Sequence, residues 1–187
     1  MSEFEQYMAG FNLLSKEEWK TVRSNIRVQE LAKGTLLEKT GKVCHHYYFI
    51  QKGAARTFSY LDDKEITIRF SFENELTTSF ISFITGFPAV VSLELLEDSI
   101  IHSMSKTELE ILYTEIPKLE SLAKNIFQFF IKKNHEENEL LRFLPAKERL
   151  EHLLKYQPKI FERVPHIYIA SYLGITPETL SRIRKQP

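Results

Sequence analysis

The 187-residue chain has no net charge, since 25 Lys and Arg balance 25 Asp and Glu, and 43% of its residues are hydrophobic. This apolar content is enough to bury a core and argues against a disordered chain. The single cysteine, Cys44, excludes an internal disulfide, and the sequence contains no Cys/His group with zinc or iron–sulfur spacing. We therefore expect a folded protein of one domain, or of one larger and one small domain, without a metal or other cofactor.

Neither a secretion signal nor a membrane span is visible in the sequence. Residues 1–10 are acidic and lack the basic region and apolar stretch of a signal peptide. The most apolar segment, residues 80–91, is too short to span a bilayer and is interrupted by Gly86 and Pro88. We expect a cytoplasmic protein without a membrane partner.

The charges are distributed unevenly along the chain. Residues 145–187 contain eight Lys and Arg against four Asp and Glu, whereas the residues before them contain 17 against 21. An acidic body with a basic C-terminal segment favours an anionic partner for that segment, such as nucleic acid.

In chain order, the first predicted element is a helix that begins at Ser15. Ser15 suits the N-cap position, and Glu18, three residues later, completes a capping box in which each side chain accepts from the other residue's backbone N–H. Trp19 is then expected to be a packing residue of this helix.

From about residue 31 to residue 105, short runs of β-forming residues alternate with turn signals. The turn signals are Lys33-Gly34, Thr40-Gly41, Lys52-Gly53, Asp62-Asp63, and Gly86 with Pro88. Their separation, roughly eight to twelve residues, is typical of an all-β sandwich or small barrel rather than of βαβ units. Residues 47–50 and 67–70 are rich in β-formers. The first half is therefore predicted to be mainly strand.

A long helix is predicted from near Pro117 to Phe143, after a second capping box formed by Ser105 and Glu108. Apart from a polar interruption at residues 132–139, its apolar residues are spaced by three or four: Leu119, Leu122, Ile126, Phe129 or Phe130, Leu140, Leu141 and Leu144. Such a helix would be about 40 Å long, more than a small barrel can cover. We therefore expect a second copy of the chain to cover it, as a homodimer.

Residues 145–187 predict a compact helical unit. Pro145 favours a helix start, and the next helix, residues 146–156, has Leu150, Leu153 and Leu154 on its inner side. Two short helices are expected after Pro165. A unit of about forty residues is small for independent folding, so we expect it to dock on the long helix.

Near the C-terminus the chain carries the local signals of a helix-turn-helix. Ala170 is small enough for a second helix to cross close by, Gly174 can adopt the left-handed conformation that ends the first helix, and Ile175 can fill the turn. Thr176 can cap the second helix, and Pro177 suits its first position.

The second of these helices is predicted to enter the major groove of DNA. With Ile169, Leu173, Leu180 and Ile183 facing inward, polar side chains spaced by three or four remain on the free face. The candidate DNA-binding residues are Thr176, Glu178, Thr179, Ser181, Arg182 and Lys185. A hairpin whose charged face merely meets water is the alternative. The coincidence of turn glycine, cap, crossing alanine and basic face in one register favours DNA recognition.

The whole chain resembles the Crp/Fnr superfamily of transcription regulators, in the compact form common in the Bacteroidetes. The resemblance rests on three segments: LAKGTLL at 31–37, YFIQKG at 48–53 followed by Arg56, and IASYLGITPETLSRI at 169–183. It implies an α+β protein with a cyclic-nucleotide-binding-like β jelly roll and N-terminal helix (1–116), a dimerisation helix (117–144) and a helix-turn-helix domain (145–187). It further implies a non-enzymatic regulator that binds an inverted repeat in double-stranded DNA, with RNA polymerase and a small-molecule effector as further partners.

The resemblance argues against cyclic AMP as the effector. Family members that bind it present Gly-Glu-Leu to the ribose and an Arg-Ser pair to the phosphate. Here Asn74-Glu75-Leu76 matches the first without its glycine, and the pair falls at Ala89 and Val90. A buried phosphate without an arginine would cost several kcal/mol.

Other effector residues follow from the same resemblance. The positions of the long helix that contact the base correspond to Asn134 and His135, which would face either a cavity or solvent. The candidate effector pocket is therefore Glu75, Leu76, Ala89, Val90, Asn134 and His135. The oxygen-sensing branch needs several cysteines and is excluded. His45 and His46 are poor haem ligands, since adjacent strand residues point to opposite faces.

Two alternatives from other classes stay open. One is a ligand-sensing jelly-roll module that signals to a protein partner and carries a degenerate helix-turn-helix. The other is a cupin-like enzyme, although His45, His46 and Glu65 lack the spacing of a catalytic metal cluster.

Overall fold

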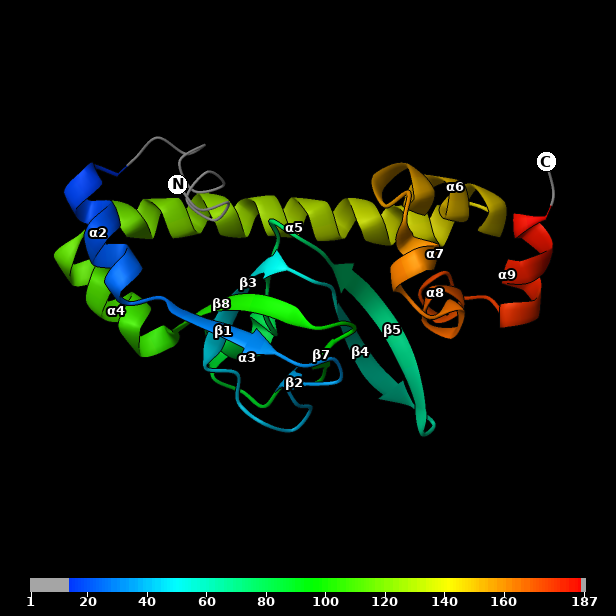
Figure 1. Cartoon of the computed structure of the whole chain (residues 1–187), viewed down its shortest axis with the longest axis horizontal. Helices are drawn as coiled ribbons and strands as arrows, with labels where there is room; N and C mark the ends of the chain where they lie inside the picture. The colour runs from blue at the N-terminus through cyan, green and yellow to red at the C-terminus, as the bar shows by residue number, and fades with distance from the viewer. Residues whose placement is uncertain (1–13, 186–187) are drawn as a thin grey trace.

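The computed structural model describes residues 14–185, without the side chains of Phe129, Phe130, Lys133 and Asn134. A β body lies beside one long helix, α5 (Lys118–Phe143), which runs along most of the long axis of the molecule (Figure 1). Helices α2 (Lys16–Ser24) and α4 (Lys106–Glu115) lie at one end. At the other end are α6 (Ala146–Tyr156), α7 (Ile160–Arg163), α8 (His166–Tyr172) and α9 (Pro177–Arg184).

The β body consists of two four-stranded antiparallel sheets. One has the order β1 (Arg27–Leu31), β8 (Ser99–Ser105), β3 (His46–Lys52) and β6 (Leu76–Thr77). The other has the order β2 (Leu36–Glu38), β7 (Ser92–Leu95), β4 (Ala55–Leu61) and β5 (Lys64–Ser71). The predicted α+β class and the strand-rich first half are confirmed. No helix within residues 14–185 is long and apolar enough to cross a membrane.

Two turns of the β body depend on backbone conformations that few residues adopt. In the β4–β5 hairpin Asp62 and Asp63 both have positive φ, 49° and 61°, as a two-residue hairpin loop of type I′ requires. Gly53 has φ +113°, and a Cβ there would lie 2.0 Å from Ser99 Oγ. Only glycine fits at position 53, which explains why the segment YFIQKG at 48–53 ends in glycine.

Both predicted capping boxes are formed. Ser15 N donates to Glu18 Oε2 at 2.6 Å, and Glu18 N donates back to Ser15 Oγ at 3.2 Å. Ser105 N and Glu108 form the same pair at the start of α4, at 2.7 and 3.2 Å. These bonds fix the points where the chain enters α2, before the β body in the sequence, and α4, after it.

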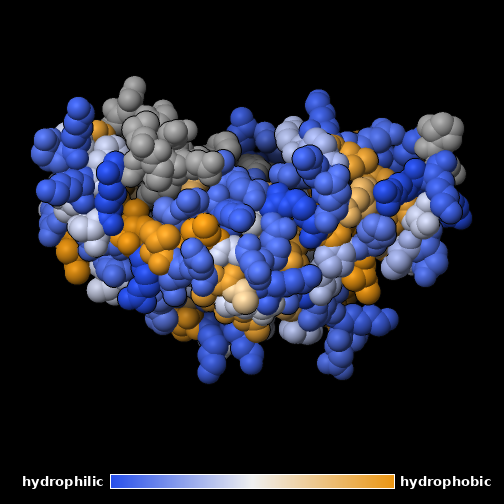
Figure 2. Space-filling view, viewed as in Figure 1, coloured by the Kyte–Doolittle hydropathy of each residue, from blue (hydrophilic) through white to orange (hydrophobic). Residues whose placement is uncertain are grey.

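The two halves of α5 have different surroundings. In the first half Leu119 and Leu122 are buried against the β body and join a core with Phe49, Leu76 and Met104. In the second half Ile131 is 53% exposed. In the space-filling view hydrophobic residues gather below the first half of α5 and again near the C-terminal helices (Figure 2). The predicted apolar face of the long helix is therefore buried by its own chain at the start, whereas Leu140, Leu141 and Leu144 near its end are half-buried.

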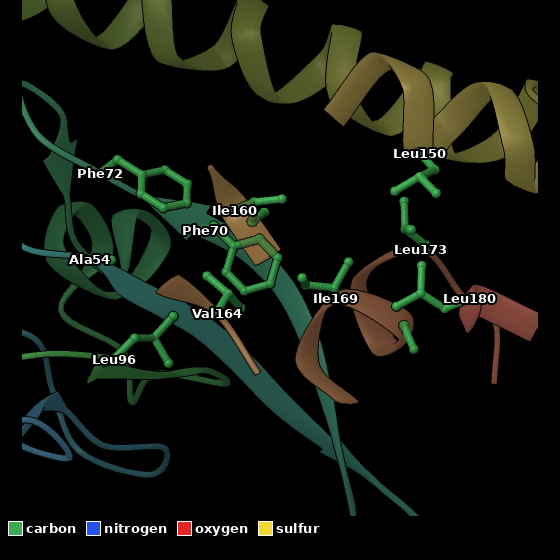
Figure 3. Packing of buried hydrophobic residues seen from close by; sticks show 11 residues of the cluster. Ala54, Phe70, Phe72, Leu96, Leu150, Ile160, Val164, Ile169, Leu173 and Leu180 are labelled. Carbon is green, nitrogen blue, oxygen red and sulfur yellow. The ribbon is translucent and has the colours of Figure 1, made fainter. Parts of the chain in front are cut away.

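The C-terminal helices dock mainly on strand β5, and not on the long helix as the sequence predicted. Their inner residues share one core with Ala54, Phe70, Phe72 and Leu96 of the β body (Figure 3). The helical members of this core are Leu150, Ile160, Val164, Ile169, Ala170, Leu173 and Leu180. The expectation was wrong because part of the sheet's apolar surface, including Phe70 and Phe72, faces these helices.

Candidate nucleic-acid interface

The turn between α8 and α9 has the geometry that its sequence predicts. Gly174 has φ +65°, and its N–H donates to Ser171 O at 3.0 Å. The N–H of Ile175 donates to Ala170 O at 3.0 Å, which completes the hydrogen-bond pattern of a Schellman motif. Ala170 is fully buried, as a close crossing of two helices requires. The chain therefore leaves α8 in one fixed direction.

The start of α9 is fixed by its cap. Thr176 Oγ1 accepts from Thr179 N at 3.2 Å, and Pro177 occupies the first helical position. Leu180 is only 2% exposed and joins the core shared with α8. This anchoring sets which side of α9 meets solvent.

The outward side of α9 carries the predicted DNA-binding residues. Thr176, Glu178, Ser181, Arg182 and Lys185 are exposed, and Thr179 is half-buried. Hydrogen bonds from its own backbone N–H and from Thr176 hold the pKa of the Glu178 carboxyl below its usual range, so it is ionised at neutral pH. The helix thus displays a carboxylate followed, one turn later, by an arginine.

Arg184 lies to one side of this face. Its guanidinium carbon lies 4.3 Å from the centre of the Phe161 ring of α7, within cation–π distance. This contact places Arg184 on the flank of α9 rather than on its outward side.

A buried arginine fastens α8 to the β body. Arg56 of β4 is 2% exposed, and its guanidinium carbon lies 4.2 Å from the centre of the Phe58 ring and 3.6 Å from that of Tyr168 in α8. Its Nε donates to Glu94 at 2.7 Å and its Nη2 to Glu65 at 2.5 Å. Because the charge is paired and stacked, Arg56 can be buried where sheet and helix meet.

A second arginine fastens α7. Arg163 donates to both oxygens of Glu73, at 2.9 and 2.7 Å, and also pairs with Glu97. Partial burial raises the pKa of Glu73, but the bonds from Arg163 and from Gly53 N–H outweigh it and hold that pKa below its usual value. Ser171 Oγ adds a third attachment by accepting from Thr67 N at 2.9 Å. Together these contacts hold the α8–α9 pair against the sheet.

Several solved structures have a similar arrangement, and transcription regulators are among them. FixK2 from Bradyrhizobium japonicum has a TM-score of 0.73 at 17% identity, over 86% of this chain and 83% of that one. The c-di-GMP responsive global regulator CLP from Xanthomonas campestris has 0.72 at 16%, over 91% and 90%. A Crp/Fnr-family transcriptional regulator from Eubacterium rectale has 0.72 at 18%, over 95% and 85%. The chain has the Crp/Fnr-type fold. Its sequence matches no protein-family model and no curated protein.

Within this Crp/Fnr-type fold, the predicted effector residues do not gather in one cavity. Glu75 lines a cavity beside the second half of α5, whereas Leu76 lines another beside its first half. Ala89 is buried, Val90 is 72% exposed, and the His135 side chain is 73% exposed with an ion pair to Glu139; none of the three lines either cavity. The side chain of Asn134 lies outside the described residues.

The missing glycine of the Gly-Glu-Leu pattern has a structural substitute. Asn74 has φ +65°, in the left-handed region that glycine would otherwise supply and that asparagine tolerates better than most residues. Asn74 N donates to Ile50 O at 2.9 Å, and Ile50 N donates to Glu75 O at 3.0 Å. The turn is therefore kept without the glycine.

The remaining sequence candidates for sensing chemistry lie in unreactive surroundings. Cys44 is 1% exposed, and burial raises the pKa of its thiol to about 11, so it stays protonated at neutral pH. His45 is exposed and His46 is half-buried. Among the described residues, no group of three or more His, Cys, Asp or Glu side chains is placed to hold a metal ion.

Proposed function

We propose that the protein is a dimeric transcription regulator that binds double-stranded DNA through a helix-turn-helix formed by α8 and α9. The observation that carries the proposal is the outward face of α9, where Glu178, Ser181, Arg182 and Lys185 are all exposed on a helix whose other side is anchored. This combination suits insertion into the major groove. We assign no enzymatic activity to the chain.

The side chains of α9 divide into two proposed roles. Arg182 can donate two hydrogen bonds to guanine O6 and N7, and the ionised Glu178 can accept from cytosine N4, so these two residues read the sequence. Thr176, Thr179 and Ser181 supplement them. Lys185, with Arg184 on the flank, contacts phosphates and positions the helix without reading bases.

The proposal divides the chain into a sensory jelly roll with its N-terminal helix (1–116), a dimerisation helix (117–144) and a DNA-binding domain (145–187). The exposed second half of α5, which includes Ile131 and Phe143, supports pairing with a second copy. Two copies of α9 related by a twofold axis would read an inverted repeat with half-sites about one helical turn apart. As a transcription regulator, the dimer would act with RNA polymerase, under a small-molecule effector other than cyclic AMP.

A salt titration on a DNA duplex tests DNA binding directly. Affinity should fall linearly on a log–log plot against salt, because binding releases about 0.9 counterion for each neutralised phosphate. Lys185→Ala should lower the slope by roughly one ion per subunit. The matched control is Lys20→Ala, at an exposed lysine of α2 at the opposite end of the molecule, which should leave the slope unchanged. A DNA affinity that does not change with salt concentration would contradict the proposed interface. So would an equal change of the salt slope in Lys185→Ala and Lys20→Ala.

A further inference from the structure

A cavity of about 570 Å³ lies where β5, the connection between β5 and β6, the second half of α5, α6 and α8 meet. Phe70 and Phe72 line it from the β body, Tyr172 from α8, and Leu140 and Leu141 from α5. Figure 3 shows the two phenylalanines projecting from the sheet toward the C-terminal helices. Aromatic walls and this volume are typical of pockets for small organic ligands.

The guanidinium group of Arg149, from α6, is a positively charged group in the lining of the cavity. Its Nη1 donates to Leu141 O, in the last turn of α5, at 3.1 Å. Its Nε is buried and has no hydrogen-bond partner among the residues that the structure describes. In a guanidinium group, Nε and Nη2 point the same way and match the two oxygens of a carboxylate. A buried donor without a hydrogen bond is unfavourable, and an acceptor bound at this edge would supply that bond.

The other charges around the cavity limit what can bind. Lys132 pairs with Glu136 at 3.8 Å, and Glu75 accepts from Phe72 N at 3.3 Å. Glu137 also lines the cavity, so three carboxylates surround it. These carboxylates repel a ligand with several negative charges more strongly than a ligand with one carboxylate, whose single charge can pair with Arg149.

We propose that this cavity binds a small aromatic monocarboxylate, whose carboxylate pairs with the Nε edge of Arg149 and whose ring packs against Phe72 and Tyr172. The phosphate-anchoring arginine that the β body lacks at positions 89–90 thus has a counterpart in α6. The site joins three parts of the chain, because its lining comes from the β body, the long helix and the C-terminal helices.

Arg149 also contacts the turn that sets the direction of α9. A Cβ at Gly174 would lie 3.5 Å from Arg149 Nη1, so the guanidinium group lies against the α8–α9 turn. A carboxylate that pairs with Arg149 would therefore affect the position of a side chain that contacts both the end of α5 and this turn. This coupling rests on the proposed DNA-binding function, whereas the ligand site does not.

Calorimetry on the full chain, with 1-naphthoate as the probe and 1-naphthamide as its neutral counterpart, tests the site. We expect the acid to bind at least about tenfold more tightly than the amide, since only the acid can form a charge-assisted pair. Arg149→Gln should abolish this preference, while Arg142→Gln, at an exposed arginine of α5, should keep it. Equal binding of acid and amide by the unmodified chain, no binding of either at millimolar concentration, or a preference that survives Arg149→Gln would overturn the proposal.

Two further measurements test the ligand site in the unmodified chain and its coupling to DNA binding. Intermolecular NOEs in the unmodified chain should connect the naphthyl protons to the rings of Tyr172 and Phe72, and NOEs confined to other residues would refute the site. Saturating naphthoate should also change the Kd for DNA in the unmodified chain but not in Arg149→Gln. An unchanged Kd with an occupied cavity would overturn the coupling. A protein that binds naphthoate but not DNA would instead refute the proposed function and support the ligand site.

Discussion

Replacing Arg182 separates base reading from general attraction to DNA. Arg182 is exposed on α9, one turn beyond Glu178, and it does not belong to the core that anchors the helix. Arg182→Ala should therefore leave the free energy of unfolding almost unchanged. On the preferred operator it should cost about 1–3 kcal/mol for each half-site, or roughly 5- to 150-fold in Kd per half-site, which is the loss expected for one bidentate arginine–guanine contact.

The assay is fluorescence anisotropy with an operator duplex and a scrambled duplex of equal length at several salt concentrations. Arg182→Ala should weaken the operator complex and relax the preference at one base pair of each half-site, with little effect on the scrambled duplex. Arg182→Lys is the matched control for charge, because lysine keeps the attraction to phosphate but cannot form the planar fork. Equal losses on both duplexes would show that Arg182 is only a phosphate contact.

Three further outcomes are expected. The unmodified protein should sediment as a dimer at micromolar concentration, and acidic residues at both Ile126 and Phe130 should give monomers that bind DNA poorly; a native monomer would refute the dimer. Calorimetry should show cyclic AMP binding weakly or not at all, because positions 89–90 offer no arginine, and micromolar affinity would contradict this. Arg163→Gln should lower the free energy of unfolding at pH 7 by about 1–3 kcal/mol, as expected for lost hydrogen bonds between charged groups. The lowered pKa of Glu73 stabilises the fold at pH values above 4.5, its ordinary value, and this contribution is lost as pH falls through the lower folded-state pKa. Denaturant titrations of both chains should therefore converge in acid, and a difference that persists near pH 2 would argue against the Arg163–Glu73 pair.

The features that the sequence predicted correctly depend on residues close together in the chain. Each capping box joins residues three apart, and the turn after α8 needs only Gly174 and its immediate neighbours. Such local signals act through hydrogen bonds between residues that are near neighbours in the sequence, so they do not depend on distant parts of the chain. The long helix was predicted for a related reason, since its apolar spacing persists over several turns.

The features that the sequence could not predict depend on distant partners. Arg163 meets Glu73 across 90 positions, and Thr67 meets Ser171 across 104. Nothing local distinguishes Arg163 from a solvent-exposed arginine, so the docking of the C-terminal helices on β5 was missed. Helix α3 (Phe80–Thr85) was also missed, because six residues that end at Gly86 are too few to show a helical period.

The candidate sites differ in the same way. The outward residues of α9 follow from one helical register, so the sequence placed them correctly on the exposed side. The effector residues were carried over from a resemblance across a segment, residues 77–91, whose local structure contains α3. The cavity beside Arg149 and Glu75 brings together charged and aromatic side chains of elements that are distant in the sequence.

The most direct test of the central claim is selection of bound sequences from a random pool of double-stranded DNA by the unmodified full chain. We predict enrichment of an inverted repeat with half-sites about one helical turn apart. Each half-site should contain a position at which the unmodified chain selects guanine and the Arg182→Ala variant does not. A pool that shows no enriched sequence, while the protein remains folded, would contradict the claim that α9 reads DNA.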